Sequence, residues 1–247
     1  MSPKSALILF AKAPIPGQVK TRLCPPLTPD EAASLHGSFV LDALERSRGI
    51  ANLDRFLACA PAADHVFFKI MEERQGVRLM SQLGEDLGAR MTHAMTVAFS
   101  QGYRSVLMVG TDLPTLSPAI YSQALVLLAQ HDLVLGPALD GGYYLVGLTR
   151  PLPDLFVGIP WSTGQVLALT RQKADSLGLK TGLLPPHRDV DTIDDLRTLI
   201  EEAGLGARGK RQAPASSLSP RASGLSERTA GALRMVANRL QQRGLTG

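Results

Sequence analysis

Short apolar runs alternate with longer amphipathic segments along most of the 247-residue chain. The apolar runs have the length and composition of buried β-strands, which predicts strands at residues 5–10, 55–60, 77–82, 105–110, 132–138, 143–148 and 179–185. Between these runs, apolar residues recur at helical spacing, which predicts helices at residues 28–48, 62–71, 84–102, 117–130, 163–177 and 191–204. This alternation predicts an α/β layer fold with a mostly parallel sheet, whose ligands bind at the carboxyl ends of the strands.

The C-terminal part of the chain differs in composition from the rest. Residues 206–247 contain eight Lys and Arg and a single acidic residue, Glu227, so they carry a charge of +7, whereas residues 1–205 carry −3. The segment GARGKRQAPASSLSPRASG reads as a linker, which divides the chain into a domain at 1–205 and an appendage. Beyond it, residues 225–244 are expected to form a short basic helix or a disordered tail. The basic charge of the appendage is no reason to expect nucleic-acid binding by the domain.

The cysteine content and the hydropathy indicate a cytoplasmic protein. Only Cys24 and Cys59 occur, without close spacing, which fits a reducing compartment and argues against a disulfide framework or a structural zinc site. The apolar runs are far shorter than the ~20 residues of a membrane span. The N-terminal residues lack the apolar segment of a secretory signal, so we expect no membrane span.

The stretch FAKAPIPGQVKTRL follows the first predicted strand and concentrates positive charge. It is neither a Walker loop nor a GxGxxG dinucleotide motif. Gly17 permits close approach of a ligand, and Pro16 reduces the entropy lost in fixing the loop. Lys12, Lys20 and Arg22 supply cations for phosphate oxygens. The loop is therefore predicted to bind a nucleotide, and a solvated basic loop is the alternative.

Two further stretches place carboxylates after predicted strands. In MVGTDLPTL, Asp112 follows a strongly apolar run and is a candidate ligand for Mg²⁺ or Mn²⁺, although it could instead cap a turn. In HRDVDTIDDL, Asp189 and Asp191 precede a helix start; one of them is a candidate second metal ligand, and the other a capping residue.

The stretch LGPALDGGYYLVGL joins two predicted strands through a turn. Asp140, Gly141 and Gly142 read as a hairpin turn on their own. The two glycines also leave room for a ligand, Asp140 can accept a hydrogen bond from an acceptor hydroxyl, and Tyr143 or Tyr144 must face the ligand side.

Other candidates carry weaker signals. Arg90, in GEDLGARM, could reach a phosphate, while Asp86 is more simply a helix cap. Trp161 could stack on a base or sugar, but a core position is equally compatible. None of the five histidines shows metal-ligand spacing, and Cys24 has no evident base beside it for a nucleophilic role.

The order of these motifs resembles one bacterial family. The chain is similar to the DUF2064-like "transferase 1, rSAM/selenodomain-associated" proteins through six motifs in the same order, FAKAPIPGQVKTRL, DLGARM, VGTDLPTL, GPALDGGYYLVGL, IPWST and DVDTIDDL. Members of this family are catalogued as GT-A-type glycosyltransferases, and some are linked to arsenosugar biosynthesis. The resemblance covers about residues 6–202. More distantly, the layout is similar to the molybdenum-cofactor and phospholactate guanylyltransferases. It implies a three-layer α/β/α fold of the nucleotide-diphospho-sugar-transferase type.

The resemblance also implies roles for the candidate residues. The nucleotide would be bound by Lys12, Pro16, Gly17, Lys20, Arg22 and Arg90, and Mg²⁺ or Mn²⁺ would be held by Asp112 and Asp191. The acceptor side would be lined by Gly141, Gly142, Tyr143 and Trp161. The catalytic residues would be Asp112, Asp140 and Lys20. Glycosyl transfer from a nucleotide-sugar to a small acceptor is the first expectation. Nucleotidyl transfer from a nucleoside triphosphate and non-catalytic nucleotide binding stay open, because the chain lacks the DxD triplet of many glycosyltransferases and the glycine-rich loop of the guanylyltransferases.

Overall fold

The computed structural model describes residues 4–205 and 224–242. The chain forms two compact units. We call residues 1–13, 43–111 and 117–188 the sheet unit, and residues 14–42, 112–116 and 189–247 the helical unit. The linker predicted from residue 206 lies outside the described residues. None of the described helices combines the length and the apolar character that a membrane crossing requires.

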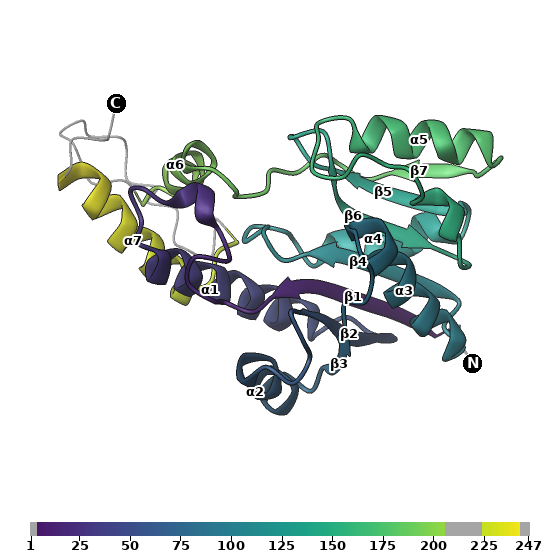
Figure 1. The fold of residues 1–247 in the computed structure, drawn as a ribbon, viewed down its shortest axis with the longest axis horizontal. Helices are drawn as coiled ribbons and strands as arrows, with labels where there is room; N and C mark the ends of the chain where they lie inside the picture. Colours follow the sequence, from purple (N-terminus) through teal and green to yellow (C-terminus); the bar gives the residue numbers. More distant parts are fainter. Residues whose placement is uncertain (1–3, 206–223, 243–247) are drawn as a thin grey trace. The chain divides into compact units, whose positions relative to one another are not determined.

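One seven-stranded sheet forms the sheet unit (Figure 1). The strand order is β3-β2-β1-β4-β6-β5-β7, and β6 is antiparallel to both its neighbours while the other pairs are parallel. The strands are β1 Ser5–Lys12, β2 Leu53–Ala60, β3 Arg78–Ser81, β4 Ser105–Gly110, β5 Leu133–Pro137, β6 Tyr143–Leu148 and β7 Thr181–Leu183. All seven predicted strands therefore occur, in a mostly parallel sheet.

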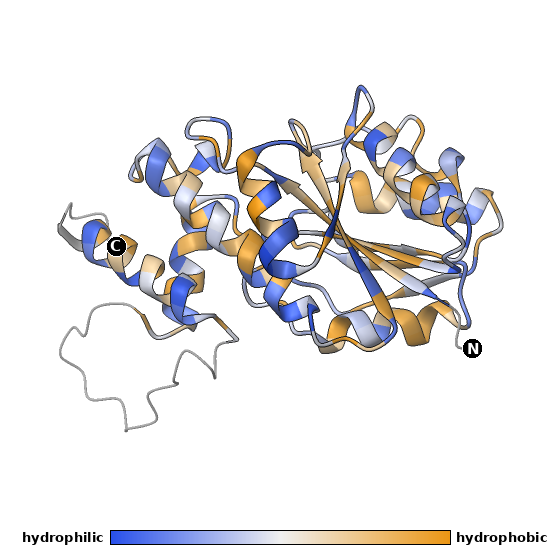
Figure 2. Cartoon of the chain, turned by 90° about the horizontal axis from the view of Figure 1, so that it is seen from below, coloured by the Kyte–Doolittle hydropathy of each residue, from blue (hydrophilic) through white to orange (hydrophobic). Residues whose placement is uncertain are grey.

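Helices cover both faces of this sheet. On one face, α3 (Leu87–Ser100) and α5 (Val166–Ser176) share a core with side chains of the strands, including Ile8 and Met108. On the other face, α4 (Ala119–Leu128) contacts β4, β5 and β6. Gly147 permits this close packing, because a Cβ at that position would lie 2.8 Å from Leu107 Cδ2 and 3.1 Å from Leu128 Cδ1. Figure 2 shows the strands mostly in the colour of hydrophobic residues, which agrees with a sheet buried on both faces.

The boundaries of one predicted helix are shifted. α2 spans Val66–Gln75 instead of residues 62–71. His65 caps its first turn by accepting a hydrogen bond from Phe67 N at 3.2 Å, and Gly76 ends it in a left-handed conformation with φ 60°. Histidine is not among the preferred capping residues, so composition gave no signal for this start.

The helical unit consists of η1 (Thr21–Leu23), the part of α1 (Pro29–Ser47) up to Asp42, α6 (Ile193–Glu202) and α7 (Glu227–Gln242). These helices share a core of apolar side chains that includes Phe39, Leu199 and Leu233. α7 is the helical outcome of the two that the sequence left open for the C-terminal appendage.

Candidate functional site

The basic loop after β1 turns sharply before it reaches Lys20. Gln18 N donates to Ile15 O at 3.0 Å, and Gly17 supplies the positive φ of 76° inside this turn. Lys20 then takes a left-handed conformation, with φ 49° and ψ 35°, immediately before η1. Such a conformation is costly for a residue with a Cβ and persists where surrounding contacts fix it. The contacts of the Lys20 side chain provide that fixation.

The Lys20 ammonium lies against three oxygen atoms of the helical unit. Its Nζ donates to Val190 O at 2.7 Å and to Asp191 Oδ1 at 2.7 Å, and it lies 2.8 Å from Asp112 Oδ1. The side chain is only 4% exposed. Burial opposes its charge, but the two carboxylates outweigh that effect and raise the pKa of Lys20. Lys20 therefore remains a buried cation.

Asp112 lies between two basic side chains. Its Oδ1 is buried and lies 2.8 Å from Lys20 Nζ and 3.4 Å from Nδ1 of His36, whose side chain is 6% exposed. Burial would raise the pKa of Asp112, but the Lys20 charge and the hydrogen bond from His36 lower it well below its usual range. The Asp112 side chain as a whole is 36% exposed, so its exposed area belongs to atoms other than Oδ1.

Two chain segments join to bring these groups together. Asp112 follows β4 by two residues, and its carbonyl accepts a hydrogen bond from Val190 N at 3.0 Å. Asp191 directly precedes Thr192, which caps α6 in a reciprocal capping box with Asp195. Since Thr192 is the capping residue, the Asp191 carboxylate is not needed for the cap and lies instead on Lys20, with 42% of its side chain exposed.

This pair of carboxylates is compatible with a divalent cation. The Oδ1 atoms of Asp112 and Asp191 lie 2.8 and 2.7 Å from one nitrogen and are thus at most 5.5 Å apart. No group of three or more His, Cys, Asp or Glu side chains within the described residues could hold a metal ion. Two carboxylates supplemented by phosphate oxygens are nevertheless a common set for Mg²⁺.

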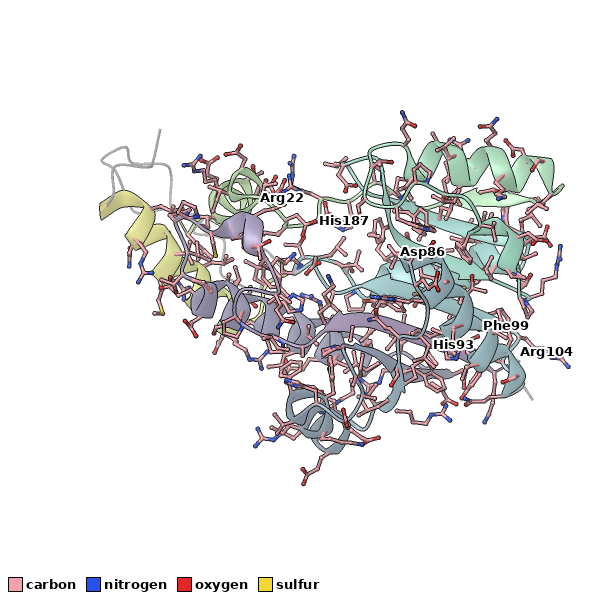
Figure 3. The ribbon with its side chains drawn as sticks, viewed as in Figure 1. Arg22, Asp86, His93, Phe99, Arg104 and His187 are labelled. Carbon is pink, nitrogen blue, oxygen red and sulfur yellow. The ribbon has the colours of Figure 1, made fainter. Side chains whose placement is uncertain are left out.

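The remaining cations of the loop are placed differently. Arg22 is exposed on η1, where Figure 3 labels it, and Pro16 and Gly17 are exposed in the preceding turn. Lys12 is the exposed last residue of β1 and belongs to the sheet unit. Of the predicted phosphate-binding cations in the helical unit, Lys20 is buried and Arg22 faces solvent.

A second group of predicted residues gathers in the sheet unit around the β5–β6 hairpin. Asp140 Oδ1 accepts a hydrogen bond from Gly142 N at 2.8 Å, which closes the turn, and the side chain is exposed. Gly141 has φ 90°, and a Cβ there would lie 2.1 Å from Gly164 O. Leu167 N donates to Gly141 O at 2.9 Å. The hairpin turn is thereby fixed to the start of α5 through its backbone.

Aromatic side chains pack beside this hairpin. The rings of Tyr143 and Trp161 meet edge to face with centroids 6.4 Å apart. Trp161 also packs closely on α3, since a Cβ on Gly88 would lie 2.7 Å from its Nε1. Tyr143 Oη and Trp161 Nε1 are buried without a hydrogen-bond partner among the described residues. Ser162 is left-handed with φ 64°, so the loop that carries Trp161 is also conformationally restricted.

Asp86 and Arg90 both bind backbone atoms at the start of α3. Asp86 Oδ1 accepts a hydrogen bond from Ala89 N at 2.7 Å and caps the helix, as the sequence suggested; Figure 3 shows Asp86 at this end of α3. Arg90 Nε donates to Gly84 O at 3.0 Å, so this part of the side chain binds the preceding loop. A phosphate contact by Arg90 stays a prediction.

His36 is the site residue that sequence reasoning missed. It lies within α1, and its contact with Asp112 joins positions 76 residues apart in the chain. No neighbouring motif marks His36, and a search for metal-ligand spacing among histidines cannot detect a histidine whose partner is a distant carboxylate.

The chain has recognisable relatives. Residues 43–163 match the family described as "Uncharacterized protein conserved in bacteria (DUF2064)". A "putative nucleotide-diphospho-sugar transferase" from Desulfovibrio desulfuricans G20 is 33% identical, with a TM-score of 0.80 over 96% of this chain and 97% of its own. Among the curated proteins, none matches the sequence.

More distant solved structures share the fold. A cytidylyltransferase from Leptospira borgpetersenii serovar Hardjo-bovis (strain JB197) is 15% identical, with a TM-score of 0.51 over 98% of this chain and 96% of its own. CMP:2-keto-3-deoxy-manno-octonic acid synthetase, solved with CTP, is 12% identical, with a TM-score of 0.51 over 81% of this chain and 99% of its own. The predicted nucleotide-diphospho-sugar-transferase-like α/β fold is thus confirmed, and the chain belongs to the bacterial DUF2064 family.

Proposed function

We propose that this protein is a nucleotide-dependent glycosyltransferase, which moves a sugar from a nucleotide-sugar to a hydroxyl of a small acceptor. The observation that carries the proposal is the pair of partly exposed carboxylates, Asp112 and Asp191, fixed on one buried ammonium. The name of the 33% identical relative, "putative nucleotide-diphospho-sugar transferase", supports the same class of donor.

The helical unit would bind the diphosphate of the donor. Asp112 and Asp191 would hold Mg²⁺ or Mn²⁺ through their exposed oxygens, together with phosphate oxygens of the donor. When bound, the cation neutralises the negative charge that develops on the leaving diphosphate. Arg22, exposed on η1, is suited to a bidentate contact with the same phosphates, and Pro16 and Gly17 shape the loop that presents it.

The sheet unit carries the other candidate residues. Lys12 and Arg90 are candidates for contacts with nucleotide phosphates, and Asp140 is the candidate for the acceptor. Asp140 is an exposed carboxylate with one oxygen engaged by Gly142 N, so its other oxygen can accept the hydrogen bond of an acceptor hydroxyl. In the transfer, the acceptor hydroxyl oxygen bonds to the anomeric carbon, the bond from this carbon to the diphosphate breaks, and the hydroxyl proton passes to a general base, for which Asp140 is the candidate.

Neighbouring residues would shape the acceptor side. Gly141 and Gly142 keep the turn free of side chains, and the packed rings of Tyr143 and Trp161 offer an aromatic wall of the kind on which sugars and bases pack.

Nucleotidyl transfer is the second candidate, favoured by a specific observation. The sequence at the end of β4 is Thr111-Asp112-Leu113, without the DxD triplet, and the solved structures of similar fold include a cytidylyltransferase and a synthetase solved with CTP. In that reaction an oxygen of a phosphorylated acceptor attacks the α-phosphorus of a nucleoside triphosphate, and pyrophosphate leaves.

A thermal-shift panel distinguishes these reactions. The protein is heated with Mn²⁺ or Mg²⁺ and with UDP, UDP-sugars, GDP-sugars or each nucleoside triphosphate, and Asp112→Asn is compared with Asp194→Asn. Asp194 lies on α6 in the same unit, 88% exposed, and is the matched control. A ligand at 100 times its Kd adds about 2.7 kcal/mol, which raises Tm measurably.

Each outcome of this panel favours one reading. A metal-dependent rise with a nucleoside diphosphate and its sugar, lost in Asp112→Asn and kept in Asp194→Asn, supports glycosyl transfer. A rise with a triphosphate alone favours nucleotidyl transfer. The absence of any shift contradicts both.

A further inference from the structure

The Lys20 ammonium is enclosed by protein oxygen atoms in this structure. Its Nζ donates hydrogen bonds to Val190 O and Asp191 Oδ1, each at 2.7 Å, and forms an ion pair with Asp112 Oδ1 at 2.8 Å. Phe39 lies on a further side, with its ring centroid 6.0 Å from Nζ. A phosphate could bind Lys20 only if one of these contacts broke and the 4% exposed side chain moved.

The exposed part of the cluster is negative instead. The Asp112 and Asp191 side chains are 36% and 42% exposed and the Lys20 side chain is 4% exposed, so an approaching ligand meets the two aspartates before the ammonium. Two carboxylates and one ammonium carry one net negative charge. That surface attracts a cation and repels a bare phosphate, so its chemistry is opposite to that of a phosphate-binding lysine.

We propose that Lys20 is a built-in counter-ion, which holds Asp112 and Asp191 together before a divalent cation binds and limits how tightly that cation is held. This inference rests on the proposed function, since it assigns a role at the proposed metal site. The left-handed backbone of Lys20 agrees with it, because that conformation aims the side chain at the two carboxylates.

The counter-ion role has a measurable consequence. A unit positive charge roughly 5 Å from a divalent ion weakens its binding by about tenfold even when screened as strongly as in bulk water. Removal of the charge should therefore tighten binding of the cation to the two carboxylates. A phosphate-binding lysine predicts something different: its removal would weaken nucleotide binding and leave the affinity for the metal alone unchanged.

The test is a titration with Mn²⁺ alone, followed by electron paramagnetic resonance of the free ion. Lys20→Met removes the charge, Lys20→Arg retains it, and Arg197→Met removes a charge from a partly exposed position on α6 as the matched control. We expect the Kd for Mn²⁺ to fall about tenfold in Lys20→Met and to stay near the wild-type value in the other two variants.

A stability measurement accompanies the titration. Lys20→Met leaves two carboxylates without their counter-ion, so its Tm should be lower without metal and should rise more with Mn²⁺ than that of the wild type. If Lys20→Met does not fold, Lys20→Gln takes its place, because its amide still donates hydrogen bonds without a charge.

The outcomes separate this inference from the proposed function. If the wild type does not bind Mn²⁺, the proposed metal site is wrong and the inference is overturned with it. If the wild type binds Mn²⁺ but the uncharged variants bind it equally or more weakly, the inference alone is overturned. Tighter binding in the uncharged variants and not in Lys20→Arg supports it.

Discussion

Replacement of Asp42 by alanine should release α7 from α1. The Asp42 side chain is 1% exposed and accepts hydrogen bonds from Ser226 Oγ at 2.8 Å, Thr229 Oγ1 at 2.7 Å and Arg228 Nη1 at 2.9 Å. All three donors belong to the first residues of α7 or directly precede them. One carboxylate of α1 therefore fixes the start of the C-terminal helix.

The cost can be worked out from the burial of the partners. A hydrogen bond to a charged group contributes about 1.5–3 kcal/mol, and a buried donor left without an acceptor loses the most. Thr229 is fully buried and Ser226 half-buried, whereas the Arg228 side chain is 39% exposed and can be hydrated again. Counting the two hydroxyls and little for Arg228, we expect Asp42→Ala to lower the free energy of opening of α7 by about 3 kcal/mol.

Hydrogen exchange of the amides of α7 measures this loss directly. About 3 kcal/mol corresponds to exchange roughly 100-fold faster when exchange occurs through opening of the helix. Amides of α3 serve as the internal reference, and Asp194→Ala, a substitution at an exposed carboxylate of α6, as the matched variant. Less than a threefold change in α7, or an equal change in Asp194→Ala, would refute the reasoning that Asp42 holds this helix.

Three further predictions concern single residues outside the charged cluster. Gly141→Ala places a Cβ 2.1 Å from Gly164 O at a positive φ and should lower the free energy of unfolding by more than ~2 kcal/mol. Gly17→Ala, with open space around its Cβ, should lower it only by the backbone strain of about 1 kcal/mol. Urea denaturation compares the two variants, and equal losses would contradict the close contact at Gly141. Asp86→Ala removes the cap of α3 and should cost about 1 kcal/mol in the same assay, recovered in Asp86→Ser. Burial raises the pKa of Tyr121 to about 12, so this tyrosine ionises first in the unfolded chain, and the free energy of unfolding falls as the pH rises from about 10 to 12. Tyr121→Phe should lessen that fall. An unchanged dependence of the unfolding free energy on pH in this range would contradict the shift.

Elements whose patterns extend over many residues could be predicted well. All seven strands follow from apolar runs, and the mostly parallel sheet follows from their alternation with helices. The start of α6 also has a local signature, because Thr192 and an acidic residue three positions later, Asp195, are residue types typical of a capping box. The start of α2 was predicted four residues too early, because its capping residue is a histidine and histidine is not among the residue types preferred at that position.

The fate of the C-terminal segment could not be decided from its own residues. Its periodicity allowed a helix, but isolated helices of this length are marginal in water. What stabilises α7 lies elsewhere in the chain: Asp42 is more than 180 residues from its partners, and the shared core includes Leu35 of α1 and Leu199 of α6. The residues of the segment itself could therefore predict only that it forms either a helix or a disordered tail.

The same limit applies more strongly to the charges of the basic loop. Lys20 and Arg22 are two positions apart and look equivalent in sequence, yet one is buried on carboxylates and the other is exposed. The difference arises from acceptors at positions 112, 190 and 191, up to 171 residues away, and from a left-handed backbone at Lys20 that residue propensities disfavour. Composition could therefore predict a basic loop, but only the fold separates a cation that is buried on carboxylates from one that is exposed. If Lys20 is the counter-ion of the two carboxylates, Arg22 is the loop's principal direct phosphate contact, and its substitution should weaken nucleotide binding while leaving the affinity for Mn²⁺ alone unchanged.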